Sequence, residues 1–165
     1  MGWCFTGCKS LTAAPDIPKD VTDMYSCFQD CESLTTAPAI PKGVTNMNSC
    51  FSGCKSLTAA PDIPKDVTDM YSCFQDCKSL TAAPAIPKGV TNMNSCFSGC
   101  TNLKTVTLKC DYNPAEILEA QAFKNTFKGC TALIDGGIKV PAGQLSTYQT
   151  NAATMGTTRE KFAAE

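Results

Sequence analysis

The dipeptide Cys-Phe occurs five times in this chain, at one constant interval. The first begins at Cys4, the second at Cys27 and the fifth at Cys96, and equivalent apolar residues follow each one. A fixed period in this range is typical of a solenoid, in which each repeat forms one coil and packs against its neighbours. One such coil alone buries too little apolar surface to offset the cost of ordering its backbone. The sequence therefore predicts a stack of coils.

The residue order within one coil predicts a helical turn and two extended segments. In the first coil, the spacing from Cys4 to Cys8 suits one short helical turn. Residues 11–14 then predict a short strand, and a Pro-Xaa-Ile-Pro bend follows because proline excludes helix. Residues 21–24 predict a second extended segment, after which the coil closes.

A longer period, which spans two coils, is also present. Residues 4–49 and 50–95 differ at only three positions, which are Thr6/Ser52, Glu32/Lys78 and Thr36/Ala82. Three acidic positions alternate with uncharged ones along the stack, namely Asp16, Asp20 and Asp23 with Ala39, Gly43 and Asn46. Neighbouring strands lie about 5 Å apart, so alternation doubles the spacing of like charges to roughly one Debye length. Near-identity of the two units indicates recent duplication or deliberate design.

Composition excludes several classes of protein. The chain carries 14 basic and 15 acidic residues, and it has no basic stripe of the kind that nucleic-acid binding requires. Its apolar runs are too short for a membrane span. The first residues lack a signal peptide and align with the middle of a repeat. We therefore interpret the chain as a fragment or an engineered module, whose start gives no information on localisation.

The repeat phrase CFxGCxSLTxxPxIPxxVTxM resembles the BspA-like (Treponema-type) leucine-rich repeats of host-associated bacteria. The residues that carry the resemblance in the third coil are Phe51, Gly53, Cys54, Ser56, Leu57, Thr58, Pro61, Ile63, Pro64, Val67, Thr68 and Met70. The resemblance extends from residue 4 to about residue 145. It implies a curved, right-handed array at the cell surface or secreted, which binds host proteins or other bacteria and has no enzymatic activity.

The expected fold is thus an α/β repeat solenoid, a leucine-rich-repeat-like array of 23-residue coils with short strands, short helical turns and a helical C-terminal cap. Residues 1–109 are assigned to the array and residues 110–165 to an expanded last coil and the cap, within one continuous domain. The open first coil has no such cap, so residues 3–20, with Trp3 among them, predict concentration-dependent self-association.

Three local patterns support the capped end. Residues 103–108 alternate as a strand does. The pair Asn113-Pro114 predicts the start of a helix that runs through about Phe127, and residues 101–130 form an expanded coil. Thr157 with Glu160 forms a capping box that predicts a last short helix ending near residue 165.

The cysteines form two sets with a spacing of four residues between them. On a helix this spacing separates Cβ atoms by about 5–6 Å, whereas a disulfide needs about 3.5–4.5 Å. The favoured interpretation is two columns of buried free thiols that pack as small apolar groups and donate weakly to backbone carbonyls. Disulfides and metal binding are the alternatives. The two columns are Cys4, Cys27, Cys50, Cys73 and Cys96, and Cys8, Cys31, Cys54, Cys77 and Cys100.

Other chemistry finds little support. A calcium site at Asp16, Asp20 and Asp23 is an alternative to a solvated surface, but no EF-hand-like glycine pattern surrounds them. The chain has no histidine and a single arginine, Arg159, so a serine or cysteine nucleophile would lack its usual base. Thr12, Thr35, Thr58 and Thr81 recur once per coil as single threonines rather than Thr-Xaa-Thr pairs, which argues against an ice-binding face. We expect no catalytic residues, no metal site and no cofactor.

The leading hypothesis is a non-catalytic scaffold for protein–protein interaction, with a protein partner on a host or bacterial surface implied by the resemblance. The alternative is an engineered or consensus repeat module with a purely structural role and no natural ligand. A binding face is expected on the strand side, although a shift of one residue would exchange the two faces. Its candidate residues are Lys9, Thr12, Glu32, Thr35, Lys55, Thr58, Lys78 and Thr81.

Overall fold

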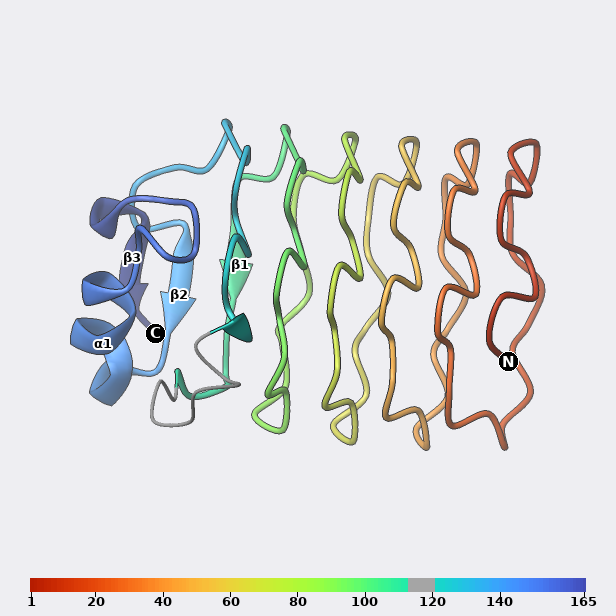
Figure 1. Cartoon of the computed structure of the whole chain (residues 1–165), viewed down its shortest axis with the longest axis horizontal. Coiled ribbons are helices and arrows are strands. Elements are labelled where there is room, and N and C mark those ends of the chain that lie inside the picture. The colour runs from red at the N-terminus through yellow and green to blue at the C-terminus, as the bar shows by residue number, and fades with distance from the viewer. Residues whose placement is uncertain (113–120) are drawn as a thin grey trace.

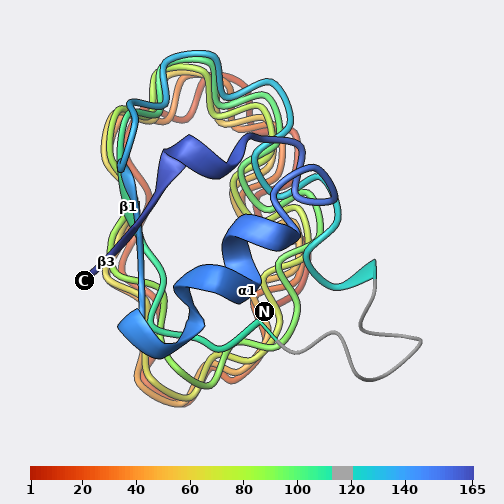
Figure 2. The same ribbon diagram turned by 90° about the vertical axis from the view of Figure 1, so that its left-hand side faces the viewer.

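The computed structural model describes residues 1–112 and 121–165, which form a stack of coils (Figure 1). The first coil lies at one end of the long axis, and the C-terminal elements lie at the other end. Figure 2 looks along the stack and shows the successive coils following nearly the same closed outline. Equivalent residues of successive coils therefore form columns along the stack.

The regular elements of the described residues lie at the C-terminal end of the stack. In chain order they are β1 (Val106–Thr107), β2 (Ile138–Val140), the 3-10 helix η2 (Ala142–Gln144), α1 (Leu145–Thr150), the 3-10 helix η3 (Arg159–Lys161) and β3 (Phe162–Ala164). The three strands form a parallel sheet in the order β1-β2-β3. In its register Val106 pairs with Ile138, and Ile138 pairs with Phe162.

Two rows of parallel bridges join the coils, one before and one after the proline bend. One row runs through Ala13, Thr36, Ala59, Ala82 and Thr105, and the other through Asp23, Asn46, Asp69 and Asn92. Neighbouring partners in both rows hold equivalent positions in successive coils. The expected strands are therefore shortened to single bridges, because the prolines between the two rows carry no amide hydrogen for a longer ladder. The strand predicted at residues 103–108 is likewise reduced to β1 with one bridge on each side.

The helical turn predicted from Cys4 to Cys8 and its equivalents is wrong. This side of each coil consists of successive tight turns, in which every second amide donates to the following coil. In the second coil, Ser26, Phe28 and Asp30 donate to carbonyls of the next coil at 2.9, 2.9 and 2.7 Å. Ser26 and Asp30 have positive φ angles of 49° and 58°. Because alternate amides leave the coil, the i to i−4 bonds of an α-helix cannot form.

The position of Asp30 alternates with glycine from coil to coil. Gly7, Gly53 and Gly99 occupy it in the odd coils with φ angles of 72°, 75° and 77°. A Cβ atom on Gly53 would collide with the carboxylate of Asp30 in the preceding coil. A bulky side chain therefore fits only in every second coil, which is a steric cause of the two-coil period in addition to charge.

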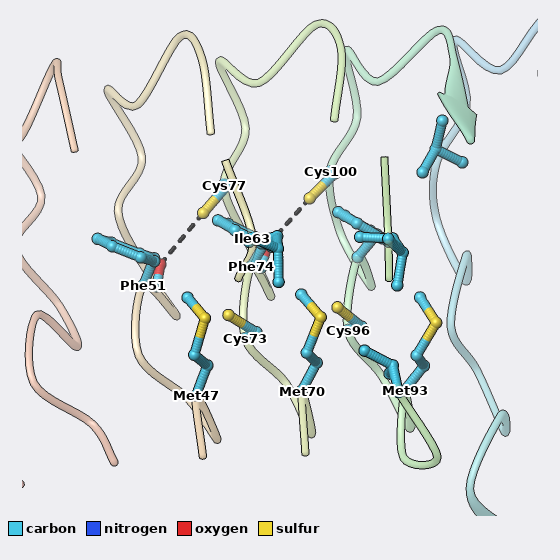
Figure 3. Packing of buried hydrophobic residues seen from close by; sticks show 14 of the residues in the cluster. Met47, Phe51, Ile63, Met70, Cys73, Phe74, Cys77, Met93, Cys96 and Cys100 are labelled. Atoms are coloured by element: carbon cyan, nitrogen blue, oxygen red, sulfur yellow. Dashed lines mark hydrogen bonds between the residues drawn. The ribbon is translucent and has the colours of Figure 1, made fainter. Parts of the chain in front are cut away.

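Aromatic, sulfur and aliphatic columns fill the interior. The rings of Phe5, Phe28, Phe51, Phe74, Phe97 and Phe127 stack in sequence with centroids 5.2–5.9 Å apart and planes within 5° of parallel. Figure 3 shows the parallel methionine column of Met47, Met70 and Met93 beside Cys73 and Cys96. In these columns each interior side chain is covered on both sides by its equivalents in the preceding and the following coil. This burial of apolar surface is the main source of stability in a stack.

The C-terminal segment lies across the end of the stack (Figure 2). In α1, Tyr148 is fully buried, and its hydroxyl donates to the carbonyl of Cys110 at 2.9 Å. The helix predicted near Glu165 is wrong. Thr158 has an extended backbone and makes no side-chain cap, η3 is a single 3-10 turn, and the chain then enters β3. Pairing with β2 and burial of the Phe162 ring outweigh the local helix signal.

The other predicted C-terminal helix, from Asn113 through Phe127, falls partly outside the described residues, since residues 113–120 are not among them. Residues 122–127 form turns rather than helix. There the amides of Asn125 and Phe127 donate to Thr154 and Met155 at 2.9 and 2.8 Å. The turn pattern of the repeats thus continues into this coil, because alternate amides again donate to the following segment instead of forming the i to i−4 bonds of a helix.

Candidate interaction surface

The eight candidate residues form two adjacent columns at the start of the strand side. Each of them is exposed, except Glu32, which is half-buried. In the threonine column, the amide and the hydroxyl of Thr35 both donate to the carbonyl of Thr12 at 3.1 Å. The Thr58 hydroxyl makes the same contact with Thr35 at 3.5 Å. Because these hydroxyls donate to backbone carbonyls of the preceding coil, their side chains are held in the same orientation and the column forms a regular surface.

The charged column centres on Glu32. Its carboxylate lies 3.1 Å from the ammonium nitrogen of Lys9 and 2.9 Å from that of Lys55. Hydrogen bonds from Lys55 and Lys9 lower the pKa of Glu32 below its usual value. Lys78 takes the equivalent place in the second unit, and it forms no ion pair with any of the described residues. The column therefore changes from balanced charge to a net positive charge along the stack.

A second threonine column was not anticipated from the sequence. The hydroxyls of Thr45, Thr68 and Thr91 each donate to the carbonyl of the preceding threonine, at 3.3–3.4 Å. Beside it, the Asp23 carboxylate accepts from the amide of Tyr25 at 2.8 Å, and the Asn46 side chain does the same for Asn48 at 2.9 Å. Aspartate and asparagine can both make this turn contact. Asp23, one of the candidate calcium ligands, thus has a structural role.

The cysteine columns differ between the first coil and the rest. Cys4 and Cys8 are exposed, which departs from the expectation of buried thiols, whereas the other ten are buried. The first coil has no neighbour on one side, and this is the physical reason for the difference. In the second column the thiols of Cys31, Cys54 and Cys77 donate to phenylalanine carbonyls at 3.1–3.2 Å. Figure 3 shows the bonds from Cys77 and Cys100.

Burial makes these thiols poor nucleophiles. Desolvation, together with the neighbouring Cys4 thiol, raises the pKa of Cys27 to about 11, and desolvation raises that of Cys130 to about 12. Thiolate is the reactive and metal-binding form of cysteine. Within residues 1–112 and 121–165, no three cysteine or acidic side chains are grouped so as to hold a metal ion. The described helices also include none that is long and apolar enough for a bilayer crossing.

Three shallow pockets lie on the strand side and its proline bend. One of about 320 Å³ lies over β1 and β2 and includes Thr105, Thr107 and Ile134. A second of about 400 Å³ is lined at the bend by Ile63, Pro87 and Lys109 among others. A third of about 280 Å³, lined by Asp16, Ile17, Lys19, Ala39, Ile40 and Pro41, repeats the second one two coils earlier. Sequence reasoning missed them because each combines residues from neighbouring coils.

The stacked coils, with their parallel bridges and apolar columns, define a leucine-rich repeat protein. The family model for the BspA type leucine-rich repeat region matches residues 24–135 in six copies. The chain belongs to the BspA type leucine-rich repeat family, as the repeat phrase indicated. Proteins of this family are repeat scaffolds that often take part in protein interactions.

Solved structures of bacterial leucine-rich repeat proteins resemble the chain. A leucine-rich repeat protein from Bacteroides ovatus is 26% identical, with a TM-score of 0.65 over 84% of this chain and 34% of that one. The chain thus spans about a third of the Bacteroides protein. A T. pallidum leucine-rich repeat protein is 19% identical, with a TM-score of 0.63 over 100% of this chain and 78% of that one. A search of curated protein sequences finds no match.

Proposed function

We propose that the chain is a non-catalytic interaction scaffold of a bacterial cell-surface or secreted protein. Its strand side, with the two columns that begin at Lys9 and Thr12, is the proposed contact face for a protein partner on a host or bacterial surface. The observation that carries the proposal is the surface column of Lys9, Glu32, Lys55 and Lys78, whose charge changes along an otherwise repeated surface. Such a change gives a partner one preferred register on the stack.

The proposal also assigns the chain to an array of coils followed by an expanded coil and a cap. Residues 1–109 form a right-handed array of 23-residue coils, and residues 110–165 form an expanded coil with a C-terminal cap that contains α1, in one domain. The constant interval between bridge partners, such as Ala13 with Thr36 and Thr36 with Ala59, supports the coil length. The crossover connection between two parallel strands of one sheet is right-handed in nearly all proteins, which supports a right-handed array.

A retention experiment tests the interaction role. The immobilised chain is exposed to solubilised surface proteins of bacterial and mammalian cells, beside a Lys55→Glu/Lys78→Glu variant. Lys42→Glu/Lys124→Glu is the control with the same change of net charge at other exposed sites. The proposal predicts proteins that the wild type and the control retain and the column variant loses. Retention of none, or equal retention by all three chains, contradicts it.

The second candidate is a repeat module with a purely structural role and no ligand. It is favoured by the near-identity of residues 4–49 and 50–95, because binding surfaces that adapt to one partner vary between coils. The same experiment separates the two candidates, since a structural module retains no partner through the column.

The open face of the first coil is proposed to mediate self-association of this chain. Trp3 is 61% exposed there, and its ring lies 5.4 Å from that of Tyr25. Cys4 and Cys8 are exposed, whereas their equivalents in the inner coils are fully buried. In the inner coils the equivalent face packs against the preceding coil. On the first coil this face is therefore apolar, and its backbone groups lack the partners that a preceding coil provides.

A further inference from the structure

Basic charge is concentrated in one part of the array. Residues 77–110 contain four lysines and no acidic residue, although the whole chain has a net charge of −1. The four are Lys78, Lys88, Lys104 and Lys109, and all are exposed. None of them forms an ion pair with another described residue. Unlike Lys9 and Lys55, they have no carboxylate partner within residues 1–112 and 121–165, and their ammonium groups can meet an anionic group from outside.

Two neighbouring extended segments on the strand side, residues 83–87 and 105–109, contain Lys109 and are flanked by Lys88 and Lys104. Ile86, Val106 and Leu108 are buried. The Ile86 amide donates to Thr107 at 2.8 Å, and the Lys109 amide donates back to Ile86 at 2.9 Å. Because side chains alternate along an extended chain, the residues between the buried ones face outward. These outward residues are Ala83, Ala85, Pro87, Thr105, Thr107 and Lys109, which we call the basic trough.

The basic trough joins two of the three pockets. Ala83, Thr105 and Thr107 line the pocket of about 320 Å³. Ala85 and Lys109 line the pocket of about 400 Å³. The two sets lie two residues apart along the same segments, a step of about 7 Å in extended chain. The two pockets therefore follow one another along the strand direction, over a floor of small side chains.

Charge and shape at the two ends of the basic trough are distinct. At one end Lys65 and Lys88 join Lys109, with Asp62 as the one carboxylate in that lining. At the other end the half-exposed side chain of Ile134 lies beside Lys139 and Asp135.

Carboxylates lie near the lysines at both ends of the basic trough. Asp135 pairs with Lys161 at 2.9 Å, and Asp66 pairs with Lys65 at 3.5 Å. Asp111 follows Lys109 by two residues and is exposed. Lys88, Lys109 and Lys139 form no ion pair with a described residue, so each end keeps an unpaired ammonium group, with an apolar contact at the Ile134 end.

We propose that the basic trough binds an extended acidic peptide segment of a partner protein. The inference rests on the proposed interaction role and names the chemistry of the partner. An extended peptide places alternate side chains on one face with the spacing of the strands below it. Its carboxylates would meet the lysines, and an apolar side chain would contact Ile134. The lining contains no aromatic ring or arginine on which a nucleic-acid base could stack.

The repeat supplies a matched control within the same chain. The equivalent pocket two coils earlier has the same aspartate, isoleucine, first lysine, alanine and proline. Lys42 is the counterpart of Lys88 in an identical local sequence, but it does not line that pocket, and no lysine replaces Lys109 there. Lys42→Glu therefore reproduces the Lys88→Glu half of the double change, in charge and in local sequence, without touching the basic trough.

The test measures binding of a fluorescein-labelled peptide of about ten residues, in which glutamate alternates with valine, by fluorescence anisotropy. We expect saturable, salt-sensitive binding to the wild type, and about tenfold weaker binding to Lys88→Glu/Lys109→Glu. Lys42→Glu should bind as the wild type does. A lysine–valine peptide should not bind.

Three results would overturn the inference: no saturable binding of the acidic peptide, equal losses in Lys42→Glu and the double variant, or tighter binding of single-stranded DNA or a sulfated oligosaccharide of equal charge. The retention experiment separates this failure from that of the interaction role. Surface proteins that the wild type retains and that also remain on Lys88→Glu/Lys109→Glu would contradict the basic trough and leave the scaffold role intact.

Discussion

The carboxylate of Asp30 occupies the space that a Cβ atom on Gly53 would need. Gly53 also has a φ angle of 75°, so both its backbone and its surroundings require a residue without a side chain. The same relationship joins Asp76 to Gly99 two coils later. Two consecutive coils, rather than one, therefore form the unit that can repeat without steric conflict.

Gly53→Ala should lower the free energy of unfolding by about 2–5 kcal/mol. The left-handed backbone conformation contributes about 1–2 kcal/mol, and overpacking against Asp30 contributes about 1–3 kcal/mol. Urea denaturation followed by circular dichroism measures the change.

Gly7→Ala is the matched control, because Gly7 has the same positive φ angle but no atom within 4 Å of the added Cβ. It should lose only the backbone part, about 1–2 kcal/mol. In an Asp30→Gly background, Gly53→Ala should fall to the same value. Equal losses for Gly7→Ala and Gly53→Ala in the wild type would show that the contact with Asp30 has no steric cost.

Cys54→Ala should destabilise the stack by about 0.5–1.5 kcal/mol, because the buried carbonyl of Phe28 loses its thiol donor and keeps only the Cys31 amide at 3.2 Å. Cys8→Ala changes the equivalent residue of the open coil, where the thiol is exposed, and should alter stability by less than about 0.5 kcal/mol. Urea denaturation of the two variants under reducing conditions provides the comparison. Similar losses at both sites would be inconsistent with a buried bond at Cys54.

Stability should fall as pH rises above about 9. Burial raises the thiol pKa of Cys27, Cys31 and Cys110 from 9.0 to about 11. Between these values the unfolded chain releases thiol protons that the folded chain retains, so alkaline pH favours unfolding. Each such thiol contributes up to about 1.4 kcal/mol per pH unit. Thermal unfolding at pH 8 and pH 10 measures the effect, and a constant or higher Tm at pH 10 would contradict it.

The apparent mass of the chain should rise with concentration, because the open face of the first coil is apolar. Trp3→Ser should shift this association to higher concentration. Tyr71→Ser removes an aromatic side chain that is 41% exposed on an inner coil, and it should leave the association unchanged. Multi-angle light scattering under reducing conditions distinguishes these outcomes. A wild-type chain that stays monomeric at millimolar concentration would refute the proposal.

The repeat and the family could be predicted from the sequence because the residues that face the interior recur at one interval. Phe28 and Cys31, for example, have an equivalent in each following coil, and these equivalents form the interior columns. The turn conformation could not be read in the same way. Ser26 and Asp30 adopt positive φ angles, but serine gives no local signal for this conformation and aspartate adopts it only occasionally. The bonds that hold them come from the next coil.

The C-terminal end shows the same limit. The Thr157–Glu160 pattern favours a helix locally, but Phe162 pairs with Ile138, which lies far from it in the sequence. A local pattern carries no information about that partner. In α1 only Tyr148 is buried, so its six residues show no apolar stripe. At the candidate surface, the exposed columns follow from the repeat, whereas the pockets require the relative placement of neighbouring coils.

The most direct test of the stacked architecture is the number of thiols that react in the native state. Brief alkylation of the reduced native chain, read by mass spectrometry of its peptides, should label Cys4 and Cys8 alone, and alkylation in denaturant should label all twelve cysteines. Labelling of Cys54 and Cys77 in the native state as fast as that of Cys4 would contradict the account.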